Sequence, residues 1–406
     1  MLGFAPCSPE LYSLFLPLKA EPESRPPVSK TYRSSTYRAS GVIRQSQRVA
    51  RRLHREGRYF AWENADLHTS ALCLPAIGLA LAVPLLHGNP GTAVLMGAGT
   101  VSVGFGAFQE PLFFRGAPMF AAALGIALSA TIGATIGQHA LLLAAVAVLW
   151  SFLYGLSDAI NPATAYVGLQ CCIFLVISAA IPQPFAAALL RGEGIFAGGM
   201  LQAIVMMLLW LFLRGSAAPG THTADARSFQ IKLRSLVRHT LQHNTLTLRY
   251  AIRLAITAGI AETVAYHLHF RNGYWVPMTA LIILKPQFKD TTQRAASRML
   301  GTLAGGVLAT LLTVLLRPNG AVLVVLVLVC VGASYVLLNV NYAAYSIALT
   351  AYVAFVLAIN RMPEQQTVTR RIIATSLGGA IGFGVHLATL WMKPQPEQSP
   401  PLSRRV

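Results

Sequence analysis

The sequence predicts an all-α polytopic membrane protein with about twelve transmembrane helices, arranged as two parallel six-helix repeats. Hydrophobic residues make up 54% of the 406 residues and charged residues only 11%, less than half of the share that is usual in soluble proteins. The mean hydropathy is +0.55. So few charged residues cannot cover the surface of a soluble globule with this much apolar material. The same apolar content excludes a disordered chain.

The apolar segments are long enough to cross a bilayer, which takes about 20 residues. In the first half we expect crossings at 67–87, 90–108, 118–137, 139–157, 163–181 and 193–213. In the second half we expect them at 246–268, 273–288, 298–316, 320–339, 341–360 and 371–391. The chain then divides into a basic, disordered N-terminal region 1–65, a first membrane repeat 66–214, a linker 215–245, a second membrane repeat 246–392 and a tail 393–406.

The basic residues predict how these segments are oriented. The net charge is +18, and an arrangement with the N-terminus inside places 24 of the 32 lysines and arginines in the cytoplasm, six outside and two, Arg249 and Arg253, in the seventh segment. This asymmetry predicts that both termini and the linker are cytoplasmic. Six arginines between Gly41 and Phe60 indicate either a plain anchor of this kind or a basic helix attracted to anionic lipid. Nucleic-acid binding is not expected, because no recognition motif accompanies the charge.

Landmark residues recur in the two halves, which predicts an internal duplication. At an offset of 183, Asn89 matches Asn272 and Arg115 matches Arg298; at an offset of 180, Asn161 matches Asn341, Arg191 matches Arg371, and Gly198-Gly199 matches Gly378-Gly379. Each half has an even number of segments, so the two halves share one orientation and form parallel repeats. Transporters often use this plan, with a pathway between the repeats.

Glu262, in the seventh segment, is the candidate for proton coupling. A carboxyl group in hydrocarbon is costly unless it has a partner or a proton. An equally supported interpretation is a glutamate that an arginine or hydroxyl group of a neighbouring segment satisfies.

The eighth segment is short and contains a proline. The corresponding segment of the first half, 90–108, is likewise interrupted, because it is rich in glycine. Such interrupted segments in corresponding positions of two halves point to a binding site. The substrate-binding candidates are Tyr274, Trp275, Pro277 and Thr279 in this segment and Lys285, Arg294 and Arg298 after it. For Trp275 we favour a place in an interfacial aromatic belt. The basic residues fit a topology anchor at least as well as a vestibule for organic anions.

Motifs for other chemistry are missing from the sequence. It contains no HExxH, GxSxG or GxxxxGK[ST] pattern, and its five cysteines include no CxxC pair. We therefore expect neither an enzyme nor a metal site, and no cofactor. His386 is isolated in the last segment. Glycine pairs such as Gly133/Gly137 and Gly378/Gly382 predict close helix packing.

The stretch from Tyr274 to Gly305 resembles the fusaric acid resistance family, or FUSC. The family pattern is Tyr-Trp-x-Pro-Leu-Thr, a Gln/Pro turn and Arg-x-x-Gly-Thr-x-x-Gly. The corresponding residues are Tyr274-Trp275-Val276-Pro277-Met278-Thr279, Lys285-Pro286-Gln287 and Arg298-Met299-Leu300-Gly301-Thr302-Leu303-Ala304-Gly305. The resemblance implies an inner-membrane exporter of aromatic and other small organic acids, as in Gram-negative bacteria, with the proton-motive force as its driver.

The partners that the resemblance implies are the lipid bilayer and a small organic anion as substrate. A periplasmic adaptor protein and a homo-oligomer stay open. Two other functions are compatible with the sequence. A passive organic-anion channel would carry current without a pH gradient, and a non-transporting envelope scaffold would show no flux and would co-purify with a partner.

Overall fold

The computed structural model describes residues 60–112, 114–213, 245–268, 273–286, 288–360 and 364–391. All of them fall in one compact unit, Leu53–Val406. The predictions for the basic region up to residue 59, for most of the linker, for Asn272 and for the tail lie outside the described residues.

The described residues form twelve α-helices and two short 3-10 helices, without a strand. The first half contains α2 (Leu67–Leu86), α3 (Pro90–Gly104), α4 (Ala117–Ile136), α5 (Ala140–Ser157), α6 (Pro162–Ala179) and α7 (Phe185–Phe212). The second half contains α9 (Thr245–Leu268), α10 (Trp275–Ile283), α11 (Phe288–Leu316), α12 (Gly320–Leu337), α13 (Tyr342–Ile359) and α14 (Glu364–Trp391). The 3-10 helices are η1 (Trp62–Asn64) and η2 (Phe105–Phe108), and η2 continues α3. The predicted all-α class is confirmed.

Ten of the described helices are long and apolar enough to cross a membrane. The two others are α9, which carries Arg249, Arg253 and Glu262, and α10, which has only nine residues. The multi-pass architecture is therefore clear, whereas the count of twelve crossings stays a prediction.

Three helices begin earlier than expected, and this changes the place of several arginines. Helix α7 begins at Phe185 rather than at 193, and α14 begins at Glu364 rather than at 371. Arg191, which lies before the expected crossing 193–213, and Arg371, at the first position of the expected crossing 371–391, consequently lie within helices that can span the membrane. Helix α11 begins at Phe288, so Arg298 also lies inside a helix. Polar residues hid these starts, because a hydropathy pattern detects only the apolar part of a helix. They occupy the first turns of α11 and α14, and in α7 the stretch from Arg191 to Gly194 interrupts the apolar run that begins at Phe185.

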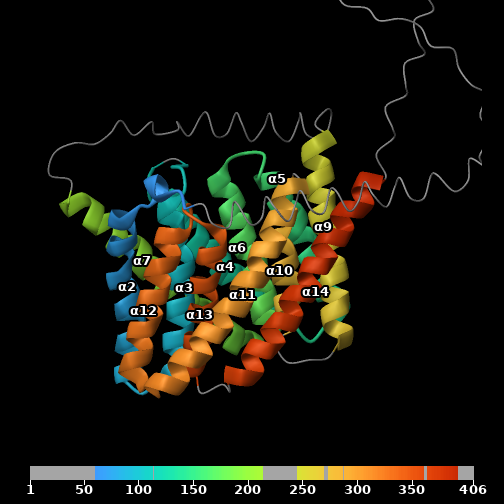
Figure 1. The fold of residues 1–406 in the computed structure, drawn as a ribbon. Coiled ribbons are helices and arrows are strands. Elements are labelled where there is room, and N and C mark those ends of the chain that lie inside the picture. The colour runs from blue at the N-terminus through green and yellow to red at the C-terminus, as the bar shows by residue number, and fades with distance from the viewer. Residues whose placement is uncertain are drawn as a thin grey trace, which may run out of the picture. The chain divides into compact units, whose positions relative to one another are not determined.

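The helix contacts of the two halves correspond pair by pair. Helices α4 and α6 pack together, as do α3 and α7; in the second half α11 packs on α13 and α10 on α14. The contacts between the halves correspond as well, because α5 packs along α9 and α12 packs along α2. Figure 1 shows α2 beside α12 at one side of the bundle and α9 beside α14 at the other. The bundle thus has two seams where the halves meet.

Glycines permit two of these close contacts at equivalent places. A Cβ atom on Gly198 of α7 would overlap the carbonyl group of Met96 on α3, and a Cβ atom on Gly378 of α14 would overlap that of Val276 on α10. Both pairs are related by the offset of 180 residues. Only glycine allows two helix backbones to approach so closely.

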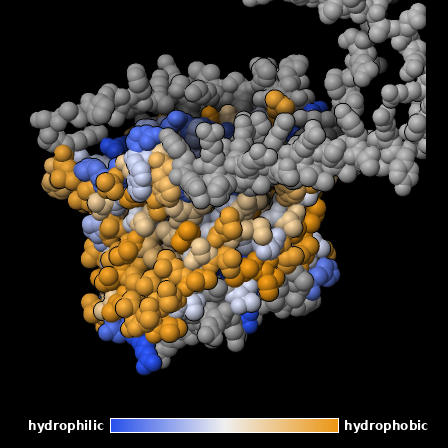
Figure 2. Space-filling model, viewed as in Figure 1, coloured by the Kyte–Doolittle hydropathy of each residue, from blue (hydrophilic) through white to orange (hydrophobic). Residues whose placement is uncertain are grey.

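The outer surface of the helices is apolar. Large side chains that are exposed include Leu149 and Leu153 on α5, Val307 on α11 and Val325 on α12. Figure 2 shows an apolar face along the sides of the helices, with hydrophilic residues gathered toward their two ends. Such a continuous apolar surface fits contact with lipid chains.

Candidate functional site

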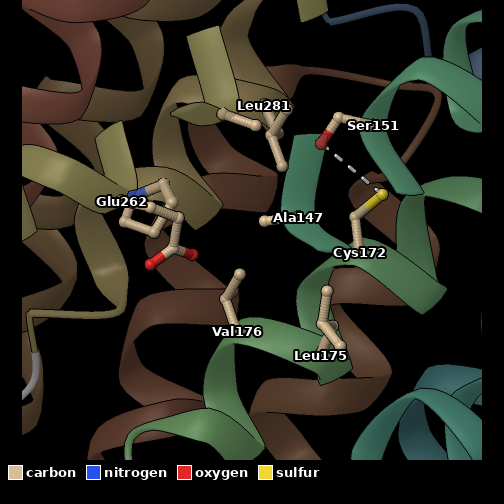
Figure 3. Close-up of a pocket in the computed structure, with 9 residues that line it drawn as sticks. Ala147, Ser151, Cys172, Leu175, Val176, Glu262 and Leu281 are labelled. Carbon is tan, nitrogen blue, oxygen red and sulfur yellow. Dashed lines mark hydrogen bonds between the residues drawn. The ribbon is translucent and has the colours of Figure 1, made fainter. Parts of the chain in front are cut away.

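A narrow pocket lies at the seam where α5 and α6 of the first half meet α9 and α10 of the second. It is lined by Ala147, Ser151, Cys172, Leu175, Val176, Ala258, Glu262, Pro277 and Leu281. Figure 3 shows Glu262 on one side of it and the Ser151 hydroxyl, which donates to the Cys172 sulfur at 4.0 Å, on the other. Both halves of the chain therefore build this pocket.

The carboxyl group of Glu262 is enclosed in apolar surroundings. The residue is 8% exposed, and its Oε1 atom has no hydrogen-bond partner. The spaces in the pocket are too narrow to hold a water molecule. The sequence left two interpretations of Glu262 open, a carboxyl group that a neighbour satisfies and one that carries a proton. The described residues provide no hydrogen-bonding partner for Oε1, which favours the second. A carboxyl group in such a place is costly in its ionised form.

Aromatic side chains close the seam between the pocket and one of its ends. Tyr154 of α5 packs with Tyr250 and Leu254 of α9 in a buried cluster. At that end, Asp158 follows α5 and lies near Lys285, which follows α10. Partial burial raises the pKa of Asp158, and the positive charge of Lys285 opposes this rise. The end of the seam thus carries charged groups, whereas its interior is apolar.

The other seam, between α12 and α13 of the second half and α2 and α3 of the first, is filled. The residues 180 positions after Ser151, Cys172 and Leu175 are Val331, Tyr352 and Phe355, and all three are buried in the main core cluster. Tyr335 of α12 also fills this region, and its hydroxyl donates to the carbonyl oxygen of Val101 at 2.8 Å. Larger side chains stand here at the positions that smaller ones hold around the pocket of the first seam.

Helix α10 carries three of the predicted substrate-binding residues, Trp275, Pro277 and Thr279, and Tyr274 directly precedes it. Pro277 is the third residue of the helix, where a missing N–H costs no helical hydrogen bond. The helix ends at Ile283, soon before Pro286, so the segment expected to reach residue 288 is cut short. Pro277 lines the pocket, and Thr279 is buried against Gly378.

Trp275 is buried, so the favoured interpretation as an interfacial belt residue is wrong. It is 2% exposed, and the Arg371 guanidinium lies over its ring at 5.2 Å from the centroid. Its ring also lies 5.3 Å from that of Tyr274. A belt tryptophan would face the lipid headgroups. The short α10 holds Trp275 inside the second half instead.

The predicted basic residues do not form one cluster. Arg298 is 2% exposed within α11, and its Nη1 donates to the Ser346 hydroxyl on α13 at 3.4 Å. Arg294 is half-buried with its guanidinium 4.8 Å from the Tyr342 ring centroid. Lys285 is also half-buried, and its backbone N–H donates to the Thr291 hydroxyl. Each of the three thus has different neighbours.

Two further residues did not enter the predicted site. Arg371 is 4% exposed, and the sequence had identified it only as the repeat counterpart of Arg191. His386, which we considered isolated, lies with its Nδ1 3.2 Å from Nη1 of Arg253 on α9. A charge pattern along the sequence cannot reveal such contacts, because α9, α10 and α14 meet only in the folded chain.

The asparagines of the repeat begin helices. Asn161 accepts a hydrogen bond from the Ala163 N–H at the start of α6, and Asn341 accepts from the N–H groups of Ala343 and Ala344 at the start of α13. Asn89 precedes α3 without such a bond from its side chain. These residues act as N-caps. The two arginines related by the offset of 183 differ. Arg115 precedes α4 and is exposed, with its guanidinium 4.1 Å from the Trp210 ring centroid, whereas Arg298 is buried.

Comparison with known proteins points to the second half of the chain. Residues 258–385 match the family described as fusaric acid resistance protein-like. The chain is 30% identical over 148 residues to the uncharacterized protein YhfK of Escherichia coli (strain K12), and the match covers 36% of this chain and 21% of that protein. It is 28% identical over 148 residues to the uncharacterized protein slr1298 of Synechocystis, covering 36% and 20%.

A third relative is the inner membrane protein YccS of Escherichia coli (strain K12), which is 26% identical over 157 residues, covering 38% of this chain and 21% of YccS. The chain thus spans about a fifth of the length of these relatives. No solved structure matches it. The matched residues 258–385 include Glu262, α10, Arg298 and Arg371. The resemblance read from the sequence is therefore confirmed: over this region the chain is similar to the fusaric acid resistance protein-like family.

Proposed function

We propose that the protein is a secondary transporter of the inner membrane that exports aromatic or other small organic acids and couples this export to protons. The observation that carries the proposal is the buried carboxyl group of Glu262, which faces a pocket built by both halves. Glu262 is the proton carrier in this scheme. The residues around the pocket form the part of the pathway that is closed in this structure.

The physical basis of coupling is the cost of enclosing a charge. Glu262 can be sealed in an apolar pocket cheaply only when its carboxyl group is neutral. When the seam opens toward one side, water reaches the carboxyl group and a proton can leave or bind. Each closure of the seam then requires a protonated Glu262, and this requirement ties the conformational change to proton movement.

The membrane and the arrangement of the chain in it are part of the proposal. The printed name of YccS supports the inner membrane, and the excess of basic residues on one side supports cytoplasmic termini. The corresponding helix contacts support residues 66–214 and 246–392 as two membrane repeats. A periplasmic adaptor protein and a homo-oligomer stay predictions.

Transport into proteoliposomes tests the proposal. Purified protein is reconstituted, and the flux of radiolabelled benzoate is measured with and without a pH gradient. We expect flux that the gradient drives and that Glu262→Gln abolishes. The control is Glu193→Gln, the same substitution at an exposed position of α7, which should transport like the wild type.

Other results would contradict the proposal in distinct ways. Benzoate current without a pH gradient, equal in wild type and Glu262→Gln, would indicate a passive channel. No flux for any of a panel of aromatic acids, together with a co-purifying partner, would indicate a scaffold. Gradient-driven flux that survives Glu262→Gln would remove Glu262 from the mechanism.

A further inference from the structure

Two arginines are buried where α11 and α14 pack against each other. Arg298 of α11 is 2% exposed and Arg371 of α14 is 4% exposed. Arginine is almost never fully buried unless an acidic group or another partner accompanies it. Taking a charged group such as a guanidinium out of water is costly unless a partner compensates it. A pair of such residues therefore needs an explanation.

The described residues do not satisfy this pair. Nε of Arg298 and Nη1 of Arg371 are buried without a hydrogen-bond partner. Arg298 donates only a long hydrogen bond to Ser346, and Arg371 lies over the Trp275 ring. Neither forms an ion pair with an acidic side chain within the part of the chain that the structure describes. Their positive charges moreover act on each other, so the place carries an excess of positive charge.

We propose that Arg298 and Arg371, with Trp275 and Ser346 beside them, form the binding site for the carboxylate of a small aromatic acid. Guanidinium groups bind carboxylates through paired N–H donors, and a carboxylate would supply the acceptors and the negative charge that this place lacks. The ring of Trp275 is covered in this structure and Tyr274 is half-buried, and both rings would contact the body of such an acid once the site opens. Its part in transport rests on the proposed function, whereas binding can be measured without transport.

The site belongs to the second half alone. Arg191, the counterpart of Arg371, is only half-buried, and its Nη1 donates to the carbonyl oxygen of Ser178 at 3.2 Å. Arg115 is exposed. The first half therefore offers a matched control: an arginine at the corresponding helix position whose donor already has a backbone acceptor.

The ligand comes from solution rather than from the lipid. Arg298 and Arg371 are covered on nearly all sides by helices of the bundle, so any ligand reaches them only when the bundle opens. A small soluble acid can then enter whole, whereas a lipid phosphate would have to bring its attached chains with it. Between soluble anions, an aromatic carboxylate is favoured over chloride because only the former uses both the paired donors and the neighbouring rings. The test compares these ligands directly.

Thermal unfolding of the full chain in a neutral detergent is measured with sodium benzoate, with benzamide and with sodium chloride at equal ionic strength. Benzoate should raise the unfolding midpoint in a concentration-dependent way, and neutral benzamide and chloride should not. Arg298→Gln and Arg371→Gln should lose this shift, and Arg191→Gln should keep it. Arg371→Lys, which retains the charge without the paired donors, should bind benzoate at least tenfold more weakly.

An unchanged midpoint of the wild type in benzoate would overturn the inference, whether or not any variant folds. An equal shift with benzamide or chloride, or a full benzoate shift in Arg371→Gln, would overturn it too. Measuring transport as well as binding distinguishes a failure of this site from a failure of the proposed function. Benzoate binding through these arginines without any transport refutes the proposed function alone, and transport without such binding refutes this site alone.

Discussion

The crossing of α10 and α14 depends on Gly378, and Gly378→Ala should loosen it. This crossing places Trp275 under Arg371 and holds the short α10 in the bundle. A methyl group on Gly378 would overlap the carbonyl oxygen of Val276 and would lie 2.9 Å from Cβ of Thr279. The variant therefore tests whether the site is built on a close backbone contact.

The magnitude follows from the contact distances. Two carbon atoms pack at about 3.5–4.0 Å, so the helices must separate by at least about 0.6 Å to accept the methyl group. Overpacking of this kind costs about 1–3 kcal/mol. The change from glycine to alanine also favours the helix by about 1 kcal/mol. Gly384→Ala lies on the same helix and has no atom within 4 Å of the new methyl group. It should gain the stability from higher helix propensity without any steric overlap.

The assay is the unfolding of both variants in detergent by a denaturant series. We expect Gly378→Ala to be less stable than Gly384→Ala by about 1–3 kcal/mol. Comparison of the two variants removes the helix-propensity term, which they share. Equal stability of the two would refute the close crossing.

Three further predictions concern other parts of the bundle. Asp158→Asn should stabilise the protein near neutral pH, because burial raises the pKa of the carboxyl group in the folded state and its ionised form is therefore costly. This cost disappears as the pH falls toward 3.8, the pKa in the unfolded chain, so the stabilisation by the substitution should shrink in acid. A stabilisation that stays constant with pH in melting experiments would contradict this. Asn341→Ala should cost about 1 kcal/mol and Asn89→Ala much less, since only Asn341 caps its helix with its side chain; equal losses in denaturant unfolding would count against the capping role. Leu175→Phe should fill the pocket and reduce benzoate flux strongly, at a cost of about 1–3 kcal/mol in stability, whereas Leu153→Phe on the exposed face should leave the flux unchanged.

Helix positions were predictable because a crossing helix is long and apolar, and most boundaries agree within two residues. The exceptions at helix starts involve polar residues. Helices α11 and α14 have polar first turns, and in α7 the polar stretch from Arg191 to Gly194 separates an apolar first turn from the rest of the helix. The early end of α10 has another cause, the nearby Pro286. The glycine pairs were correctly assigned to packing, since a backbone contact needs a small residue whatever its partner is.

The composition of the site was harder to predict, because it depends on contacts between distant segments. Glu262 could be identified as a costly intramembrane group, but the sequence could not tell which side chains surround it. From the sequence, Trp275 fitted an interfacial aromatic belt, and only the packing of α14 against α10 shows that it is buried. The difference between the seam with the narrow pocket and the filled seam arises from single side chains, such as Leu175 against Phe355, whose neighbours the sequence does not reveal.

The proposed route along the seam between α5, α6, α9 and α10 can be tested most directly through Cys172, a buried free cysteine that lines the pocket. A variant retaining only this cysteine is reconstituted, and its labelling by a water-soluble thiol reagent is followed at rest and during benzoate transport. The control retains only Cys330, a buried cysteine of the other seam. Labelling of Cys172 should be slow at rest and accelerate during transport, while Cys330 stays unreactive. A rate at Cys172 that transport leaves unchanged would contradict passage through this seam.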